Sequence, residues 1–458
     1  MFGIDVKLIN KYDKPGPRYT SYPTAPQFTE GFTASNLLEE IKSTNSGNNL
    51  KDISLYFHLP FCDTLCYFCG CNMIVTRNRD RISKYLEYLE KEIDIYSDLI
   101  NPSRKIKQLH WGGGTPTHLT PDEIRNLASV IKQKFNFDDN AEASCEIDPR
   151  ELSFEHLLAL RNSGFNRISM GVQDFNPLVQ KTVNRIQPEE LTFKVISWIK
   201  DLKFSSFNLD LMYGLPHQTV DSFGDSIKKI IELEPDRVAL FNYAHVPWMK
   251  KHMELINVED IPNPAEKLAI LEMSINELTS AGYVFIGMDH FAKPSDELAI
   301  ALKEKRLYRN FQGYSTHSEL DLFALGITSI SQIGKTYSQN VKTENEYFNC
   351  LDTGILPVLK GYSLNEDDMC RKKVIMKLMC DFELDFSKIE NEFKINFEDY
   401  FSKNLENLSE MINDNLLKIE NRKIIITEKG RLLIRNIAMN FDGFIERNHD
   451  SARYSRTV

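Results

Sequence analysis

Residues 53–69 read ISLYFHLPFCDTLCYFC, an apolar run that leads into three closely spaced cysteines. The run predicts a buried strand over Ile53–His58, and the loop after it carries Cys62, Cys66 and Cys69 with the spacing C-x₃-C-x₂-C. Three thiolates hold only three irons of a [4Fe–4S] cube, because clusters of this type normally take four cysteines. The fourth iron is then open to a ligand that is not protein, which favours a catalytic cluster over an electron store.

A tetrahedral zinc site is the alternative for these thiols, with Cys71 as its fourth ligand. Zinc sites usually take two separated pairs of ligands, whereas these four cysteines lie within ten residues. The spacing therefore favours the cluster. The remaining four cysteines are scattered and are expected to be buried or idle thiols: Cys145, Cys350, Cys370 and Cys380.

Short apolar runs alternate with amphipathic helical patterns from residue 53 to about residue 290. The helix starts are recognisable, since Thr120 precedes a proline and a capping-box glutamate, and Asn263 precedes a similar sequence. This alternation predicts a parallel sheet. Six or seven units are too few for a closed eight-fold barrel, so we expect an open, partial (β/α) barrel. Its predicted strands are Ile53–His58, Ile106–Trp111, Ala141–Ile147, Arg167–Gly171, Phe207–Met212, Val238–Tyr243 and Val284–Met288.

Polar and glycine residues collect at or just beyond the ends of these strands. They are the cysteine loop, Gly112–Thr115, Glu146, Gln173, Asp210 and Ala244. In (β/α) barrels the chemistry gathers at the C-terminal strand ends, so we expect one site there. A triple glycine lets the backbone approach a ligand and offer its amides, and a carboxylate at a strand end can accept hydrogen bonds from a ribose. The alternatives are a tight turn at the glycines and hydrogen-bonded scaffold at the polar positions.

The composition is that of a soluble globular protein, with 42% hydrophobic and 26% charged residues. A net charge of −10 argues against nonspecific nucleic-acid binding. No apolar stretch approaches the roughly 18 residues that span a bilayer, and the first residues, MFGIDVK, lack the features of a secretory signal. A cluster needs a reducing compartment, so we expect a cytoplasmic protein. The absence of a heptad seam favours a monomer.

Other stretches narrow the interpretation. YFHLPFC at 56–62 and GGGTP at 112–116 resemble the two signatures of the radical S-adenosylmethionine (SAM) superfamily. More specific matches are PGPRYTSYPT at 15–24, GCN at 70–72, GFNR at 164–167, SMGVQDF at 169–175, YGLP at 213–216, FNYAH at 241–245, GMDHFA at 287–292 and RNFQGY at 309–314. From about residue 11 to the C-terminus, the chain resembles the oxygen-independent coproporphyrinogen III oxidases (dehydrogenases) of the haem pathway.

The resemblance implies a radical SAM partial barrel, a [4Fe–4S] cluster on the three cysteines, and SAM on the fourth iron. It places the first SAM against Tyr56, Gly113, Glu146 and Ile330. It also implies a second SAM, with contacts to Phe68, Gly114, Thr115, Gln173, Arg185, Asp210 and Ala244.

The resemblance further implies an oxidoreductase with no catalytic residue beyond the cluster and a 5′-deoxyadenosyl radical from reductive SAM cleavage. The radical would take a β-hydrogen from a propionate, which loses CO₂ and becomes a vinyl group. Two such steps would turn coproporphyrinogen III into protoporphyrinogen IX. Arg18, His290 and Gln312 are the expected substrate contacts. The expected partner is an electron donor such as flavodoxin or ferredoxin with its reductase, and neither nucleic acid nor a membrane.

A haem-binding chaperone of the same superfamily is the alternative function. That branch tends to lack a segment like residues 15–24 and to carry a non-cysteine at the position of Cys71. Both features are present here, so the sequence favours the enzyme.

Three units are expected along the chain. Residues 1–50 form an N-terminal extension that closes over the active site, and residues 51–360 form the catalytic partial barrel and its extension. Residues 361–458 carry helical patterns around a probable hairpin, which resembles a winged-helix-like module. Acidic stretches argue against a DNA role for this module, so we expect a mainly helical lid or docking module. The helical patterns lie at Asp367–Cys380, Phe397–Ile412 and Lys429–Asn440, and the hairpin joins Leu417–Glu420 to Lys423–Thr427.

Overall fold

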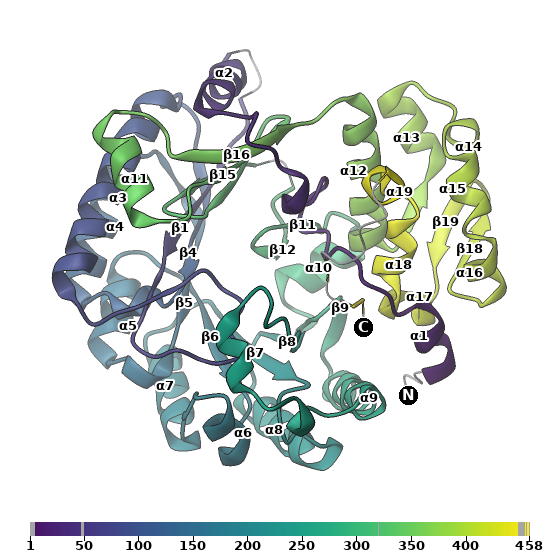
Figure 1. Ribbon diagram of the computed structural model, residues 1–458, viewed down its shortest axis with the longest axis horizontal. Helices are drawn as coiled ribbons and strands as arrows, with labels where there is room; N and C mark the ends of the chain where they lie inside the picture. Colours follow the sequence, from purple (N-terminus) through teal and green to yellow (C-terminus); the bar gives the residue numbers. More distant parts are fainter. Residues whose placement is uncertain (1–4, 47–49, 319, 448–453, 455, 458) are drawn as a thin grey trace.

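A computed structural model of the chain describes residues 5–46, 50–318, 320–447, 454, 456 and 457. It shows a large α/β unit beside a smaller, mainly helical one (Figure 1). The large unit is built on a twelve-stranded sheet. Across the sheet the order is β16 (Val358–Ser363), β15 (Thr336–Asn340), β14 (Ile330–Ile333), β13 (Asp321–Leu325), β1 (Ile53–Leu59), β4 (Ile106–Gly113), β5 (Phe137–Ile147), β6 (Arg167–Gln173), β7 (Ser206–Tyr213), β8 (Arg237–Asn242), β10 (His290–Ala292) and β9 (Val284–Gly287).

The strands from β13 to β8 run parallel, and the strands on both flanks are antiparallel. The order begins at β16 and ends at β9 without closing, so the predicted open, partial barrel is confirmed. Six of the seven predicted strands lie in the parallel run. The seventh, Val284–Met288, forms β9, which runs in the same direction as β8 but does not pair with it, because β10 lies between the two and pairs with both in antiparallel fashion. The link from β9 to β10 is too short for the crossover that a parallel pair needs.

The two faces of the parallel sheet differ in chemistry. Helices cover the outer face (Figure 1), and alternate residues such as Ile168, Met170 and Val172 of β6 are buried beneath them. The inner face carries polar side chains, including Ser169, and faces a cavity. The covering helices are α3 (Arg79–Leu99), α4 (Pro121–Lys134), α5 (Phe154–Asn162), α7 (Glu189–Asp201), α8 (Val220–Leu233) and α9 (Pro264–Ser280). The short helix α6 (Pro177–Thr182) instead packs against the cysteine loop.

Both predicted helix starts are confirmed. The hydroxyl of Thr120 accepts a hydrogen bond from the Glu123 amide (3.3 Å) at the start of α4, and the Asn263 side chain accepts one from the Glu266 amide (3.0 Å) at the start of α9. Each cap satisfies one of the amides that a helix N-terminus leaves without a partner.

The smaller unit contains the predicted helices and hairpin of the C-terminal region. Its elements are α12 (Glu366–Asp381), β17 (Glu383–Asp385), α13 (Phe386–Phe393), α14 (Phe397–Tyr400), α15 (Ser402–Glu406), α16 (Ser409–Asn413), β18 (Leu417–Glu420), β19 (Lys423–Ile426), α17 (Glu428–Leu432), α18 (Ile434–Met439) and α19 (Gly443–Arg447). The strand β17, which the sequence pattern did not predict, completes a three-stranded sheet with β19 and β18.

The N-terminal segment joins the two units. Helix α1 (Val6–Tyr12) lies against the smaller unit, and Tyr19 and Tyr22 are part of that unit's apolar core. The chain then crosses to α2 (Ala34–Thr44) above the large sheet, as the purple trace in Figure 1 shows. Among the described residues, no helix combines the length and apolar character that crossing a membrane requires.

Candidate active site

The cysteine loop is fixed at both of its ends. Its first residues form β2 (Phe61–Cys62), which pairs with β3 (Ile74–Val75) just after the loop. In between, the Tyr67 amide donates to the Val183 carbonyl (3.0 Å), and Phe68 is buried in an apolar group with Val183 and Leu215. The loop is therefore held by backbone and apolar contacts, and its sulfurs are left for other partners.

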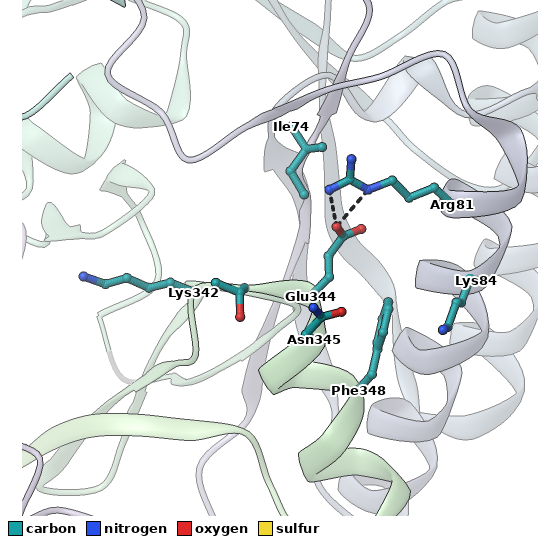
Figure 2. A pocket seen from close by; sticks show the side chains of 8 residues that line it. Ile74, Arg81, Lys84, Lys342, Glu344, Asn345 and Phe348 are labelled. Atoms are coloured by element: carbon teal, nitrogen blue, oxygen red, sulfur yellow. Dashed lines mark hydrogen bonds and ion pairs between the residues drawn. The ribbon is translucent and has the colours of Figure 1, made fainter. Parts of the chain in front are cut away.

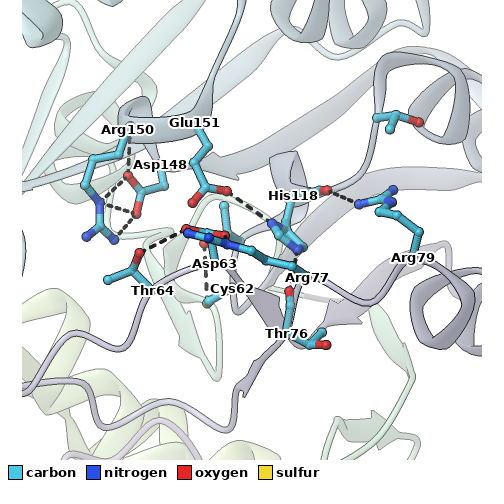
Figure 3. Close-up of polar contacts among 12 residues, drawn as sticks. Cys62, Asp63, Thr64, Thr76, Arg77, Arg79, His118, Asp148, Arg150 and Glu151 are labelled. Atoms are coloured by element: carbon cyan, nitrogen blue, oxygen red, sulfur yellow. Dashed lines mark hydrogen bonds and ion pairs between the residues drawn. The ribbon is translucent and has the colours of Figure 1, made fainter.

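Two arginines and a hydroxyl surround the thiols. The Cys62 thiol lies 3.4 Å from the Thr115 hydroxyl. Arg150 and Arg185 donate to the Cys66 sulfur over 3.3 and 3.7 Å. Figure 3 shows the hydrogen bonds from Arg150 to Asp148 beside this loop. The shortest of them is 2.6 Å, and Arg185 donates to the same carboxylate over 2.9 Å. The two guanidiniums hold the pKa of Asp148 well below its usual range, although burial alone would raise it.

The thiol environment fits a bound iron–sulfur cube. Guanidinium groups beside Cys66 complement the negative charge of a thiolate-bound cluster. In the described part of the chain no three His, Cys, Asp or Glu side chains, these thiols included, are placed to hold one metal ion.

The glycine triplet packs more tightly than its sequence suggests. A Cβ on Gly114 would lie 2.5 Å from the Pro60 carbonyl carbon, and one on Gly112 would lie 2.9 Å from the Glu146 carboxyl carbon. Gly113 also has a φ of +115°, which disfavours other residues.

Two amides of the triplet have partners within the protein, so the expectation that they bind a ligand stays a prediction. The amide of Gly113 donates to Glu146 (3.2 Å), and that of Gly114 donates to the Leu59 carbonyl (2.9 Å). The tight turn is needed to bring the end of β4 against the end of β1. Glycine at these positions is therefore explained in part by packing within the protein.

Side chains from neighbouring strands form a connected layer on the inner face. The Tyr56 hydroxyl lies 3.1 Å from Nδ1 of His58, and the Tyr56 ring stacks on that of His110. The His110 ring lies 2.6 Å from the Ser144 hydroxyl and 3.4 Å from the Glu146 carboxylate. Contacts with His110 and the Gly113 amide lower the pKa of Glu146 despite its burial. The Glu146 carboxylate is therefore ionised and can accept hydrogen bonds.

Gln173 ends β6, Asp210 lies in β7, and Arg185 lies in the loop between α6 and α7. Burial raises the pKa of Asp210 to about 7, against the effect of a 2.6 Å hydrogen bond from Asn208. Gln173 has a φ of +67°, and its Oε1 is buried with no hydrogen-bond partner in the part of the chain that the structure describes. Arg185 donates to the Gly171 carbonyl over 2.7 Å. A buried acceptor without a partner beside a fixed guanidinium is suited to a polar ligand.

A cavity of about 180 Å³ joins several of the predicted residues. It is lined by Glu146 and Asp210 from the SAM-contact set and by His290 and Gln312 from the substrate-contact set. Arg18 does not line it, but is paired with Asp289, the neighbour of His290, at 3.1 Å.

Two predicted contacts lie at the ends of their elements. Ala244 is half-buried just after β8. Ile330 opens β14 and packs in a small apolar group with Tyr337 and Phe311. Neither residue lines the cavity, so their roles as SAM contacts remain predictions.

A larger hollow of about 510 Å³ lies outside the barrel, between α3 and α11 (Glu344–Asp352). Figure 2 shows the ion pair of Arg81 with Glu344 across it, beside Ile74 and Phe348. None of the predicted site residues lines it.

The sequence interpretation missed two polar residues of the site, Arg150 and His110. Arg150 lies four residues beyond Glu146, past the strand end, and reaches back to Cys66. His110 is in register with Tyr56 and Ser144 on the inner face. Strand alternation counted back from Gly112 would have placed His110 on this face.

Comparison with known proteins agrees with this geometry. Residues 56–230 match the family described as the radical SAM superfamily, and residues 364–433 match the HemN C-terminal domain. The chain is 46% identical to the oxygen-independent coproporphyrinogen III oxidase of Salmonella typhimurium and 45% identical to that of Synechocystis sp.. Each comparison covers 99% of this chain and 98% of the relative.

A solved structure supports the same relationship. Coproporphyrinogen III oxidase (HemN) from Escherichia coli, a radical SAM enzyme, superposes with a TM-score of 0.92 at 45% identity. The superposition covers 97% of this chain and 99% of the other. The chain therefore belongs to the oxygen-independent coproporphyrinogen III oxidase family of radical SAM enzymes.

Proposed function

We propose that this protein converts two propionates of coproporphyrinogen III to vinyl groups, giving protoporphyrinogen IX in haem biosynthesis. The observation that carries the proposal is similarity over the full length to oxidases of that name, at 45–46% identity. The three cysteines, the glycine turn and the polar inner face support it, because they lie at one end of the parallel strands. The full-length similarity also favours the enzyme over the haem-binding chaperone.

Cys62, Cys66 and Cys69 would hold a [4Fe–4S] cluster, and SAM would occupy the remaining iron. When bound, the two supply a radical able to take a hydrogen atom from the substrate. The proposed contacts of this first SAM are Tyr56, Gly113, Glu146 and Ile330. Glu146 is suited to accept hydrogen bonds, since its neighbours keep it ionised.

We also propose a second SAM molecule. Its contacts would be Phe68, Gly114, Thr115, Gln173, Arg185, Asp210 and Ala244. Gln173 and Arg185 each have a buried polar atom without a partner among the described residues, Oε1 and Nε respectively. Two molecules would match the two propionates to be converted.

The protein's own part is positioning and exclusion of water. The polar layer of β1, β4 and β5 fixes Glu146, and Arg150 and Arg185 neutralise charge at Cys66. No general base is needed, because the substrate loses a hydrogen atom, CO₂ and one electron in turn. Arg18, His290 and Gln312 are proposed to contact the substrate.

Several predictions about the whole protein stay proposals. Residues 1–50 would close over the site, residues 51–360 would carry the chemistry, and residues 361–458 would act as a docking or lid module. The electron would come from a flavodoxin- or ferredoxin-like donor with its reductase. A monomer in the cytoplasm remains the expected state.

The test is an anaerobic assay of the reconstituted protein with SAM, a reductant and coproporphyrinogen III. We expect loss of two CO₂ units, measured by the mass of the oxidised porphyrin, with two 5′-deoxyadenosine per product. Cys62→Ala should abolish both products, whereas Cys350→Ala, a half-buried thiol on α11, should keep them. Equilibrium dialysis with labelled SAM should give two molecules per chain.

Three outcomes would count against parts of the proposal. SAM cleavage without decarboxylation would show that coproporphyrinogen III is not the substrate. Tight haem binding with no SAM cleavage would favour the chaperone. A stoichiometry of one would remove the second SAM site.

A further inference from the structure

Arg309 is a buried cation with no ionic partner among the described residues. It lies in β11 (Tyr308–Asn310), which forms a hairpin with β12 (Gly313–Ser315), and only 4% of the residue is exposed. Its guanidinium lies 4.8 Å from the centre of the Tyr314 ring. Nε and Nη1 have no hydrogen-bond partner in the described part of the chain. Burying the donors of a charged group without acceptors costs free energy of folding. A ligand that accepts hydrogen bonds from Arg309 would explain why a buried arginine stands at this position.

Other donors without partners lie beside it. Nδ1 of His290 and Nε2 of Gln312 are also buried without a hydrogen-bond partner among the described residues. The His290 ring and the Arg309 guanidinium both contact the Tyr314 ring, with the centres of the two rings 5.4 Å apart. Burial and then the charge of Arg309 lower the pKa of His290 to about 4. The neutral imidazole can offer one N–H group.

The other charges around His290 are already paired. Arg18 is bound to Asp289 at 3.1 Å, and Arg237 is bound to Asp296 at 2.9 Å. Arg309 is the guanidinium in this group that has no such ion pair within the described ranges. Arg309 therefore keeps a positive charge that no carboxylate among the described residues pairs, inside a protein whose net charge is −10.

This donor group borders the cavity of the active site. His290, Gln312 and Tyr314 line the same cavity as Glu146 and Asp210, which belong to the predicted SAM contacts. Arg309 is not itself a lining residue, but its guanidinium lies against the ring of Tyr314, which is one. The two acceptors come from β5 and β7, and the donors come from β10 and the β11–β12 hairpin.

We propose that Arg309, with His290 and Gln312, forms a carboxylate subsite that holds a propionate of the substrate that is not decarboxylated. The assignment rests on the proposed function. Arg309 would donate to the carboxylate oxygens as a fork, and the uncharged His290 and Gln312 would donate from the side. A propionate that reacts becomes neutral CO₂, and an ion pair would oppose that change by stabilising the carboxylate. The subsite therefore suits a propionate that the product retains.

The test measures binding of stable, oxidised porphyrins to the anaerobic holoenzyme without reductant, by absorbance and fluorescence titration. The probes are coproporphyrin III, with four propionates, mesoporphyrin IX, with only the two that the product retains, and coproporphyrin III tetramethyl ester. Arg309→Met should weaken binding of both acids by at least about 30-fold, because a buried charge pair is lost. It should leave the weak binding of the ester unchanged.

Two companion variants separate charge, shape and folding. Arg309→Lys keeps the charge without the fork and should lose about 5–10-fold in affinity for both acids. Arg306→Met, an exposed arginine three residues away, should bind as the unmodified protein does. The ligand-free Arg309→Met protein should melt no lower than the unmodified one, because no protein ion pair is lost.

The results that would contradict the proposal can be told apart from one another. Unchanged affinity of Arg309→Met for both acids would overturn the subsite. Weakened binding of coproporphyrin III alone would assign Arg309 to a reacting propionate and overturn the proposal in its present form. A large drop in melting temperature for Arg309→Met and Arg309→Lys would identify a structural guanidinium and also overturn it. Failure of the unmodified protein to decarboxylate coproporphyrinogen III would instead remove the proposed function, which these titrations do not measure.

Discussion

At the scale of single residues, Asp148 organises the surroundings of Cys66. Its carboxylate holds both Arg150 and Arg185, and both reach the sulfur. We expect Asp148→Asn to lower the free energy of unfolding at pH 7 by about 3 kcal/mol, because two guanidiniums lose their shared counter-charge. Reconstituted protein should also hold less iron. Urea unfolding and iron analysis measure the two effects.

The pH dependence of this difference has a definite sign. The pKa of Asp148 is lower in the folded state than its ordinary 3.8, so its stabilisation is present above that value. It is lost as the pH falls through the folded-state pKa. The variant and the unmodified protein should therefore differ fully at pH 6–8 and converge only in strong acid. Asp122→Asn, in an exposed pair with Arg125, should change stability by less than about 0.5 kcal/mol. Equal losses in both variants would contradict a special role for Asp148.

At the scale of elements, Glu92 on α3 ties three other segments together. It is fully buried and accepts hydrogen bonds from the Gly326 amide (2.7 Å), from Asn340 of β15 (2.9 Å) and from Tyr347 of α11 (2.6 Å). Burial raises its pKa from 4.5 to about 7. The folded state then binds a proton that the unfolded state has released, so this group makes the protein less stable as the pH rises from 4.5 to 7.

Glu92→Gln removes that titration. Relative to Glu92→Gln, the unmodified protein should lose about 3 kcal/mol between pH 4.5 and 7 and nothing more above pH 7. Denaturant unfolding over this pH range measures the change, and Glu87→Gln, at an exposed position of the same helix, should keep the slope of the unmodified protein. A difference that stays constant with pH would show that Glu92 is ionised throughout.

The elements also show how far the sequence could predict the structure. Six parallel strands and both tested helix starts follow from local patterns, namely apolar runs and capping residues. The antiparallel turn of β9 into β10, and the place of β13 next to β1, depend on contacts far apart in the sequence. The cysteine spacing identified Cys62, and a strand end together with the family resemblance pointed to Glu146. The role expected of Asp210, which lies inside β7, rests on the resemblance. Arg150 and the engaged amide of Gly114 depend on how loops meet in space, which no local pattern records.

At the scale of the whole molecule, Arg435 of α18 fastens the N-terminal segment to the smaller unit. It is 4% exposed, and it donates to the carbonyl groups of Gly16, Pro17 and Thr457. Two residues away from Gly16 is Arg18, which is paired with Asp289 at the edge of the active site. The contact therefore connects the C-terminal unit to the site through the N-terminal segment.

Arg435→Gln should free that segment without disturbing the barrel. Three buried carbonyls would lose a charged donor, and hydrogen bonds to charged groups contribute about 1.5–3 kcal/mol each. We expect amide hydrogen exchange at residues 14–22 to accelerate at least about tenfold, since 1.4 kcal/mol corresponds to a factor of ten. Exchange in β4–β8 should not change. Arg431→Gln, on the neighbouring α17 and over the Phe382 ring, should leave residues 14–22 protected. Faster exchange throughout the barrel would instead mean that Arg435 supports the whole fold, and the N-terminal segment would then have no separate stability to lose.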